Sequence, residues 1–258
     1  EHPVVREGLK YFKVRDGIEL VHNADLPAQS GLGSSSTFTV GLINTIHALK
    51  QEMATKRMLA KYAIELEQNI IRENVGSQDQ IAAAFGGFNN IKFRKNDFQV
   101  NQIPISKKRI KELEANLMLF FTGFQRSASD IASKQIKMIK EKKIDMSASV
   151  SLVDEGINIL LNNNNNIHDF GKLLDQQWMI KQSFTDEITN SSINKIYKKA
   201  IKAGAIGGKL LGAGGGGFIL FYVPKKKQNN VRSALKKLLY VPFEFENNGS
   251  QIVYLSNQ

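Results

Sequence analysis

The sequence contains no cysteine. The absence excludes disulfides, thiolate catalysis and cysteine-ligated metal sites, and it suits a reducing compartment, so we expect a cytoplasmic protein. No apolar run is long enough to cross a bilayer and no signal peptide is recognisable, so we expect no membrane partner. Histidine is scarce, and its four positions match neither a metal site nor a catalytic triad; they are His2, His22, His47 and His168.

Basic residues outnumber acidic ones, and the formal net charge is +11. Such an excess favours anionic partners. The lysines form short clusters without interleaved aromatic residues, whereas single-stranded nucleic-acid sites combine the two. We therefore expect small anions rather than nucleic acid, and we interpret most of the clusters as solvated helix faces and loop tips. The clusters are Lys107-Lys108, Lys140–Lys143, Lys198-Lys199 and Lys225–Lys227.

The order of apolar patterns predicts an α+β fold with two domains. The chain has 258 residues, of which 42% are hydrophobic, and this is enough for one large domain or two ordinary ones. Strands and helices are mixed without regular βαβ units, which argues against a doubly wound sheet. Leu117–Phe121 is apolar on both faces, and we place the boundary before it, giving domains 1–114 and 115–258.

Periodicity and turn residues predict the following elements in the first domain. They are a hairpin of Tyr11–Val14 and Ile18–Val21 around Asp16-Gly17, a buried helix over Thr37–Leu49, a helix from a Thr55 cap to Glu73, strands at Phe88–Phe93 and Phe98–Ile103, and a charged connection over Ile105–Glu114.

The second domain is predicted to be helical between its strands. The expected helices are Ser127–Lys142, Met146–Leu161, Ile167–Phe184, Ser191–Ala203 (ended by Gly204) and Gln228–Leu239, with a surface loop at Asn162–Asn166 and strands at Phe218–Val223, Phe243–Phe245 and Ile252–Leu255.

The stretch Pro27–Ser36 contains two glycines followed by three serines. Glycines allow a close approach of backbone to ligand, and the start of a helix favours an anion such as a polyphosphate. The alternative is a connector in which Ser34 caps the helix. Neither this stretch nor Gly207–Gly217 ends in the Gly-Lys-Ser/Thr of a Walker loop, and Gly31-Leu32-Gly33 lacks the third glycine of a dinucleotide fingerprint.

Three motifs in order resemble the GHMP kinases, the family of galactokinase, homoserine kinase and mevalonate kinase. Gly31–Ser36 is similar to the phosphate loop of that family, Gly76–Gln80 to the segment with the catalytic aspartate, and Gly212–Gly217 to the C-terminal glycine-rich motif. The resemblance implies an N-terminal ribosomal protein S5-like domain, a C-terminal ferredoxin-like α/β sandwich, and a site in the cleft between them.

Longer stretches resemble one branch, the D-glycero-D-manno-heptose 7-phosphate kinases, and also L-fucose kinases. They are Val75–Gly87, Phe121–Ala128 and Gly208–Phe218. The resemblance implies an ATP- and Mg²⁺-dependent kinase that forms the 1,7-bisphosphate by attack of the anomeric hydroxyl. The early Arg-x-x-x-x-Gly-Gly-Gly-Thr-Asp motif of this branch does not precede Pro27, so we expect a chain that is truncated at its N-terminus.

The resemblance also implies roles for individual residues. The phosphates of ATP would lie against Gly31, Leu32, Gly33, Ser34, Ser35, Ser36, Gly212, Ala213, Gly214 and Gly215. The Ser35 hydroxyl would meet Mg²⁺. A glutamate on the following helix would be the second ligand, and the helical pattern does not separate Glu65 from Glu67, but the family spacing to Asp79 selects Glu67.

Asp79 is implied to be the catalytic residue, which orients or accepts the proton of the sugar hydroxyl. Arg126 and Gly214 are implied to bind the substrate, with the Arg126 guanidinium gripping its phosphate as a bidentate donor. Lys209 could contact a phosphate or point into solvent.

Three other functions stay open from the sequence. An L-fucose or other hexose kinase would be identified by a coupled assay across a panel of sugars. A non-catalytic sugar-binding protein of the same fold would bind sugar without producing ADP. A basic nucleic-acid binder would bind nucleic acid with a steep salt dependence. A homodimer is compatible with the sequence.

Overall fold

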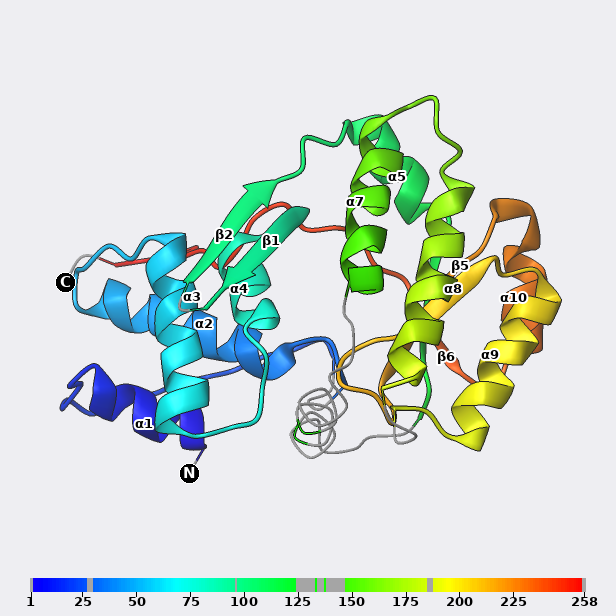
Figure 1. The fold of residues 1–258 in the computed structure, drawn as a ribbon. Coiled ribbons are helices and arrows are strands. Elements are labelled where there is room, and N and C mark those ends of the chain that lie inside the picture. Colours follow the sequence, from blue (N-terminus) through cyan, green and yellow to red (C-terminus); the bar gives the residue numbers. More distant parts are fainter. Residues whose placement is uncertain are drawn as a thin grey trace. The chain divides into compact units, whose positions relative to one another are not determined.

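The computed structural model describes residues 2–26, 30–95, 97–123, 133, 137, 147–184 and 188–256. The chain forms two compact units (Figure 1). The first comprises Glu1–Ala28, Gly33–Gln102 and Glu246–Gln258, and the second comprises Gln29–Leu32 and Ile103–Phe245. Residues 103–114 thus group with the second unit and 246–258 with the first, while the boundary between family domains at residue 114 stays a prediction. None of the described helices is long and apolar enough to span a membrane.

The first unit packs helices against one another beside an antiparallel hairpin. Its elements are α1 (Pro3–Tyr11), α2 (Ser34–Leu49), α3 (Lys56–Ile64), the π-helix η1 (Glu65–Ile70), α4 (Gln78–Phe85), β1 (Asn89–Arg94) and β2 (Asp97–Gln102). The predicted helix over Thr37–Leu49 is confirmed, and so is the cap at Thr55, whose hydroxyl accepts from the Met58 N–H. Val40 and Ile43 of α2 and Ile81 of α4 are fully buried in the shared core.

The predicted hairpin around Asp16-Gly17 is wrong. Tyr11 is the last residue of α1, and the Val14 N–H returns to the Leu9 carbonyl at 2.9 Å, which closes the helix end. A strand needs a hydrogen-bonded partner, and the described residues offer Ile18–Val21 none.

The strands predicted near the C-terminus are also not formed. The Phe245 N–H is bonded to the Glu114 carboxylate at 2.7 Å rather than to another strand. Ile252–Leu255 lies open to solvent, with Val253 94% and Tyr254 82% exposed, and no strand of the described chain pairs with it.

The second unit is built on a four-stranded sheet in the order β4-β5-β3-β6. The strands are β3 (Leu117–Phe121), β4 (Gly207–Leu210), β5 (Phe218–Tyr222) and β6 (Leu239–Val241), and every neighbouring pair is antiparallel. The helices are α5 (Lys107–Glu114), α7 (Ser147–Leu161), α8 (His168–Gln182), α9 (Ser191–Ala203), the short 3-10 helix η3 (Lys225–Lys227) and α10 (Gln228–Ala234). The predicted helix over Ser127–Lys142 lies almost entirely outside the described residues.

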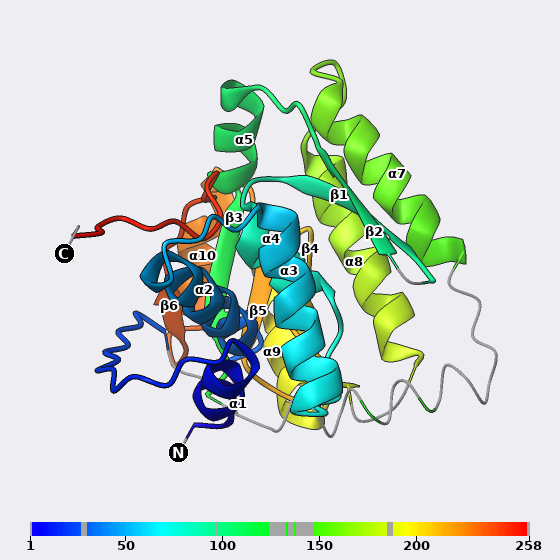
Figure 2. The ribbon, with the colours of Figure 1, turned by 90° about the vertical axis from the view of Figure 1, so that its left-hand side faces the viewer.

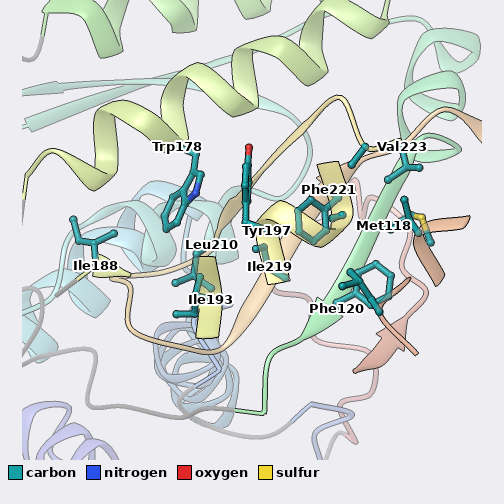
Figure 3. Close-up of a cluster of buried hydrophobic side chains, with 14 of the residues drawn as sticks. Met118, Phe120, Trp178, Ile188, Ile193, Tyr197, Leu210, Ile219, Phe221 and Val223 are labelled. Carbon is teal, nitrogen blue, oxygen red and sulfur yellow. The ribbon is translucent and has the colours of Figure 1, made fainter. Parts of the chain in front are cut away.

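One face of the sheet carries the larger core (Figure 3). Phe120, Ile219 and Phe221 point from the strands toward Ile193 and Tyr197 of α9. The alternate residues of the strands lie on the other face, where the Cβ position of Gly171 on α8 approaches Tyr222. α7 and α8 lie side by side in both views (Figures 1 and 2).

The predicted connection over Ile105–Glu114 is wrong, because residues 107–114 form α5. The Ser106 hydroxyl caps this helix, and its buried Arg109 donates to the carbonyls of Ile159 at 2.7 Å and Asn165 at 2.8 Å. These carbonyls belong to the end of α7 and the loop after it, so a charged side chain supplies the donors that a helix C-terminus needs.

Candidate active site

The start of α2 is arranged to receive an anion. Gly33 holds the N-cap position with φ 72°, and it offers no side-chain cap to the first turn. The Thr37 N–H is bonded to the Gly33 carbonyl at 2.9 Å, which leaves the N–H groups of Ser34, Ser35 and Ser36 at the open end of the helix. Gly33 rather than Ser34 is therefore the cap, and the uncapped turn suits a phosphate.

Asp79 lies directly against this turn. It is the second residue of α4, and a Cβ atom added to Gly33 would lie 3.0 Å from the Asp79 Cγ. Glycine is favoured at position 33, because the left-handed backbone and this close contact both disfavour a side chain. Protein atoms packed around the carboxyl group raise the pKa of Asp79, and the negative charge of Glu67 raises it further.

Glu67 is fully buried in the middle of η1. Its carboxylate accepts hydrogen bonds from the hydroxyls of Ser36 at 2.9 Å and Thr39 at 2.6 Å, and from the side-chain amide of Gln80. Glu65 instead lies on the outer side and accepts from Asn69. The structure therefore separates the two glutamates that the helical pattern left equivalent.

A π-helical turn positions Glu67. The Ile71 N–H reaches back to the Leu66 carbonyl, and the Glu73 N–H reaches the Glu67 carbonyl, both at 2.9 Å. The sequence predicts an ordinary helix here, and π-turns are rare segments that are frequent at functional sites.

The sequence also missed Thr39 and Gln80. Their positions in the sequence could have indicated them, since Thr39 lies one helical turn after the Ser35-Ser36 pair and Gln80 directly follows Asp79.

The surroundings of Glu67 fit a magnesium ion. A buried carboxylate normally needs a cationic partner, and Glu67 has only neutral donors among the described residues. Carboxylate and hydroxyl oxygens are ligands that Mg²⁺ accepts, with one or two protein carboxylates and substrate phosphates completing the sphere. No group of three or more acidic or histidine side chains forms a complete metal site in the described part of the chain. Glu67 would thus act together with a serine hydroxyl and phosphate oxygens.

Two glycine-rich segments meet in the second unit. The backbone of Gly31 packs on Leu211 and Gly212, and a Cβ atom on Gly212 would lie 2.6 Å from the Gly31 Cα. The Gly215 N–H is bonded to the Ile188 carbonyl at 2.9 Å, which fixes the following turn. Contact between backbones leaves peptide groups rather than side chains to line this region.

Gly217 ties this turn to the sheet. Its carbonyl accepts from the N–H and the hydroxyl of Thr122 at 2.9 and 2.7 Å. Its φ is +89°, and an added Cβ atom would lie 2.2 Å from the Ser30 carbonyl oxygen.

We expect Gly217→Ala to lower the free energy of unfolding by about 3 kcal/mol, because left-handed strain and a backbone clash combine. Gly123→Ala is the matched control, since Gly123 has φ +80° but no described atom within 4 Å of the added Cβ. That variant should lose only about 1 kcal/mol. Chemical denaturation measures both, and equal losses would contradict the clash.

The structure gathers the predicted residues into two groups, one in each unit. The first unit holds Gly33, Ser34, Ser35, Ser36, Glu67 and Asp79, and the second holds Gly31, Leu32, Gly212, Ala213, Gly214 and Gly215. Arg126 lies outside the described residues. The roles of all these residues stay predictions.

Two family models match the chain. The model described as the GHMP kinases N terminal domain matches residues 3–87, and the GHMP kinases C terminal model matches residues 158–241. D-glycero-alpha-D-manno-heptose 7-phosphate kinase of Campylobacter jejuni is 36% identical over 233 residues, which cover 88% of this chain and 68% of that protein. Galactokinase of Pyrococcus furiosus is 25% identical over 94% of this chain and 74% of its own length.

Solved structures agree with these matches. A D-glycero-D-manno-heptose 1-phosphate kinase from Bacteroides thetaiotaomicron superimposes with a TM-score of 0.66 and 26% identity, over 96% of this chain and 71% of that one. A mevalonate kinase gives the same TM-score at 20% identity, over 95% and 75% of the two chains, and this shows the shared fold.

Proposed function

This chain belongs to the GHMP kinase family, and from that premise we propose that it phosphorylates D-glycero-D-manno-heptose 7-phosphate at its anomeric hydroxyl, with ATP as the donor. The chain has the GHMP kinase fold, and its relatives indicate an ATP-dependent kinase that transfers phosphate to a sugar hydroxyl. The observation that carries the choice of sugar is the 36% identity to a heptose 7-phosphate kinase. The product would be the 1,7-bisphosphate.

The geometry of the first unit supports phosphoryl transfer. Such transfer requires positioning and charge stabilisation more than covalent chemistry by the protein. The open N–H groups of Ser34, Ser35 and Ser36 would bind phosphate oxygens at the start of α2. The Asp79 carboxylate lies beside the same turn and would accept the proton of the attacking hydroxyl. The raised pKa of Asp79 makes it a better base than an ordinary aspartate.

Glu67 and Ser35 would hold magnesium in this mechanism. When bound, the ion would neutralise charge on the phosphate oxygens. The hydroxyls of Ser36 and Thr39 keep the Glu67 carboxylate oriented while leaving one of its oxygens with a single donor. The protein thus contributes one preoriented carboxylate.

A coupled assay of ADP production across a panel of acceptors tests the choice of sugar. The panel contains heptose 7-phosphate, heptose 1-phosphate, L-fucose, galactose and mevalonate. We expect kcat/KM for heptose 7-phosphate to exceed that for L-fucose or galactose by about 10²-fold or more, because a site built for a phosphate leaves buried polar groups unpaired with a neutral sugar. Preference for L-fucose or heptose 1-phosphate would contradict the assignment, and sugar binding without ADP would indicate a non-catalytic protein.

A further inference from the structure

Two lysines lie together beside the C-terminal glycine-rich segment. Lys181 is in the last turn of α8, and its ammonium donates to the carbonyl of Gly212 and, at 3.4 Å, to that of Leu210. Lys209 lies on β4, immediately before Leu210. The two positive charges are close enough to repel each other, and neither has a carboxylate partner among the residues that the structure describes.

The packing of α8 against β4 places Lys181 and Lys209 near each other. Leu210 is fully buried in the core face of the sheet, so the side chain of Lys209 lies on the opposite face. α8 packs closely on β4, since a Cβ atom on Gly207 would lie 2.1 Å from the Gly171 carbonyl oxygen. The Asp175 side chain of α8, whose Cβ lies beside Gly207 of β4, accepts a hydrogen bond from the Tyr197 hydroxyl.

We propose that Lys181 and Lys209 form a binding site for a phosphoryl group at the Gly212 end of β4. Two half-buried ammonium groups without a counter-charge are costly in the free protein, and a dianionic phosphate would compensate both. Burial lowers the pKa of Lys209, and burial together with the Lys209 charge lowers the pKa of Lys181 to about 8. An anion bound between them removes these penalties.

The identity of the phosphoryl group rests on the proposed function. The group belongs either to the phosphorylated sugar or to the nucleotide, and both present the same dianionic chemistry. Lys209 is the better probe, because the Lys181 ammonium also donates to the carbonyls of Leu210 and Gly212, while the Lys209 ammonium has no hydrogen-bond partner among the described residues.

Binding of glucose 6-phosphate, glucose and ADP to the protein and to Lys209→Met tests the site by calorimetry. Lys199→Met is the matched control, since Lys199 is an exposed lysine on α9. We expect Lys209→Met to weaken at least one phosphorylated probe by tenfold or more and Lys199→Met to weaken none. Loss confined to glucose 6-phosphate assigns the sugar's phosphate, and loss confined to ADP assigns the nucleotide.

A second measurement needs no variant. Acetic anhydride labels lysine amines, and mass spectrometry follows each site. Millimolar inorganic phosphate should slow the labelling of Lys181 and Lys209 and leave Lys199 unchanged. Equal affinities in Lys209→Met and the unaltered protein, together with no protection by phosphate, would overturn the proposal. Neither measurement requires turnover, so a failed kinase assay with intact binding would reject the proposed function and retain this site.

Discussion

Asp79→Asn should lower kcat by about 10²–10⁴-fold, the range that a positioned general base contributes. The amide keeps the size of the carboxyl group but cannot accept the proton of the sugar hydroxyl. Nucleotide affinity should change little, because the N–H groups at the start of α2 are not altered. Steady-state ADP production and nucleotide titration measure the two quantities.

The control for this variant is Asp16→Asn, which changes an exposed aspartate in the same unit. A second readout is the pH profile of kcat/KM. Desolvation by neighbouring protein atoms and the charge of Glu67 raise the pKa of Asp79, and the base is active when deprotonated. Activity should therefore fall as pH decreases through a pKa above the ordinary aspartate value. Near-normal turnover in Asp79→Asn would remove this residue from the mechanism.

Glu67→Gln should raise the Mg²⁺ concentration for half-maximal turnover by about 10–100-fold, since the variant loses the one buried carboxylate of the site. The substitution also tests whether the charge of Glu67 affects the pKa of Asp79. Removing the negative charge of Glu67 lowers the pKa of Asp79, so the acidic limb of the pH profile should move to lower pH.

Glu65→Gln is the matched control, because Glu65 lies two residues away on the same π-helix but faces Asn69. Manganese binding followed by electron paramagnetic resonance gives a readout that is independent of catalysis. If Glu67→Gln and Glu65→Gln bind the metal equally, Glu67 is a structural acceptor of hydrogen bonds and not a metal ligand.

Local signals in the sequence predicted much of the fold. The Thr55 cap, the all-apolar β3 and the helix ended by Gly204 each depend on neighbouring residues, and each is confirmed. The hairpin near Asp16-Gly17 failed because strand formation depends on a distant partner. β4 was missed because Gly207 and Gly208 suggest a turn. In the structure, the missing side chain of Gly207 allows α8 to pack closely against this strand.

The sequence nominated candidate residues for the site but not the contacts between them. Motif resemblance selected Glu67 and Asp79 among many acidic side chains. It gave no indication that Thr39 and Gln80 hold Glu67, because these contacts join separate elements of the chain. The π-turn at Glu67 was missed because its sequence has the same apolar spacing as an ordinary helix. Lys181 and Lys209 are 28 positions apart in the sequence, and the packing of α8 on β4 brings them together.

Phosphorus NMR of the protein with MgATP and D-glycero-D-manno-heptose 7-phosphate tests the central claim most directly. We predict that the γ-phosphate signal of ATP disappears while a new signal arises that is coupled to the anomeric proton, and that both changes are slower by about 10²–10⁴-fold in Asp79→Asn. ADP formation that does not depend on the sugar, or a new phosphate on any other carbon, would contradict the account.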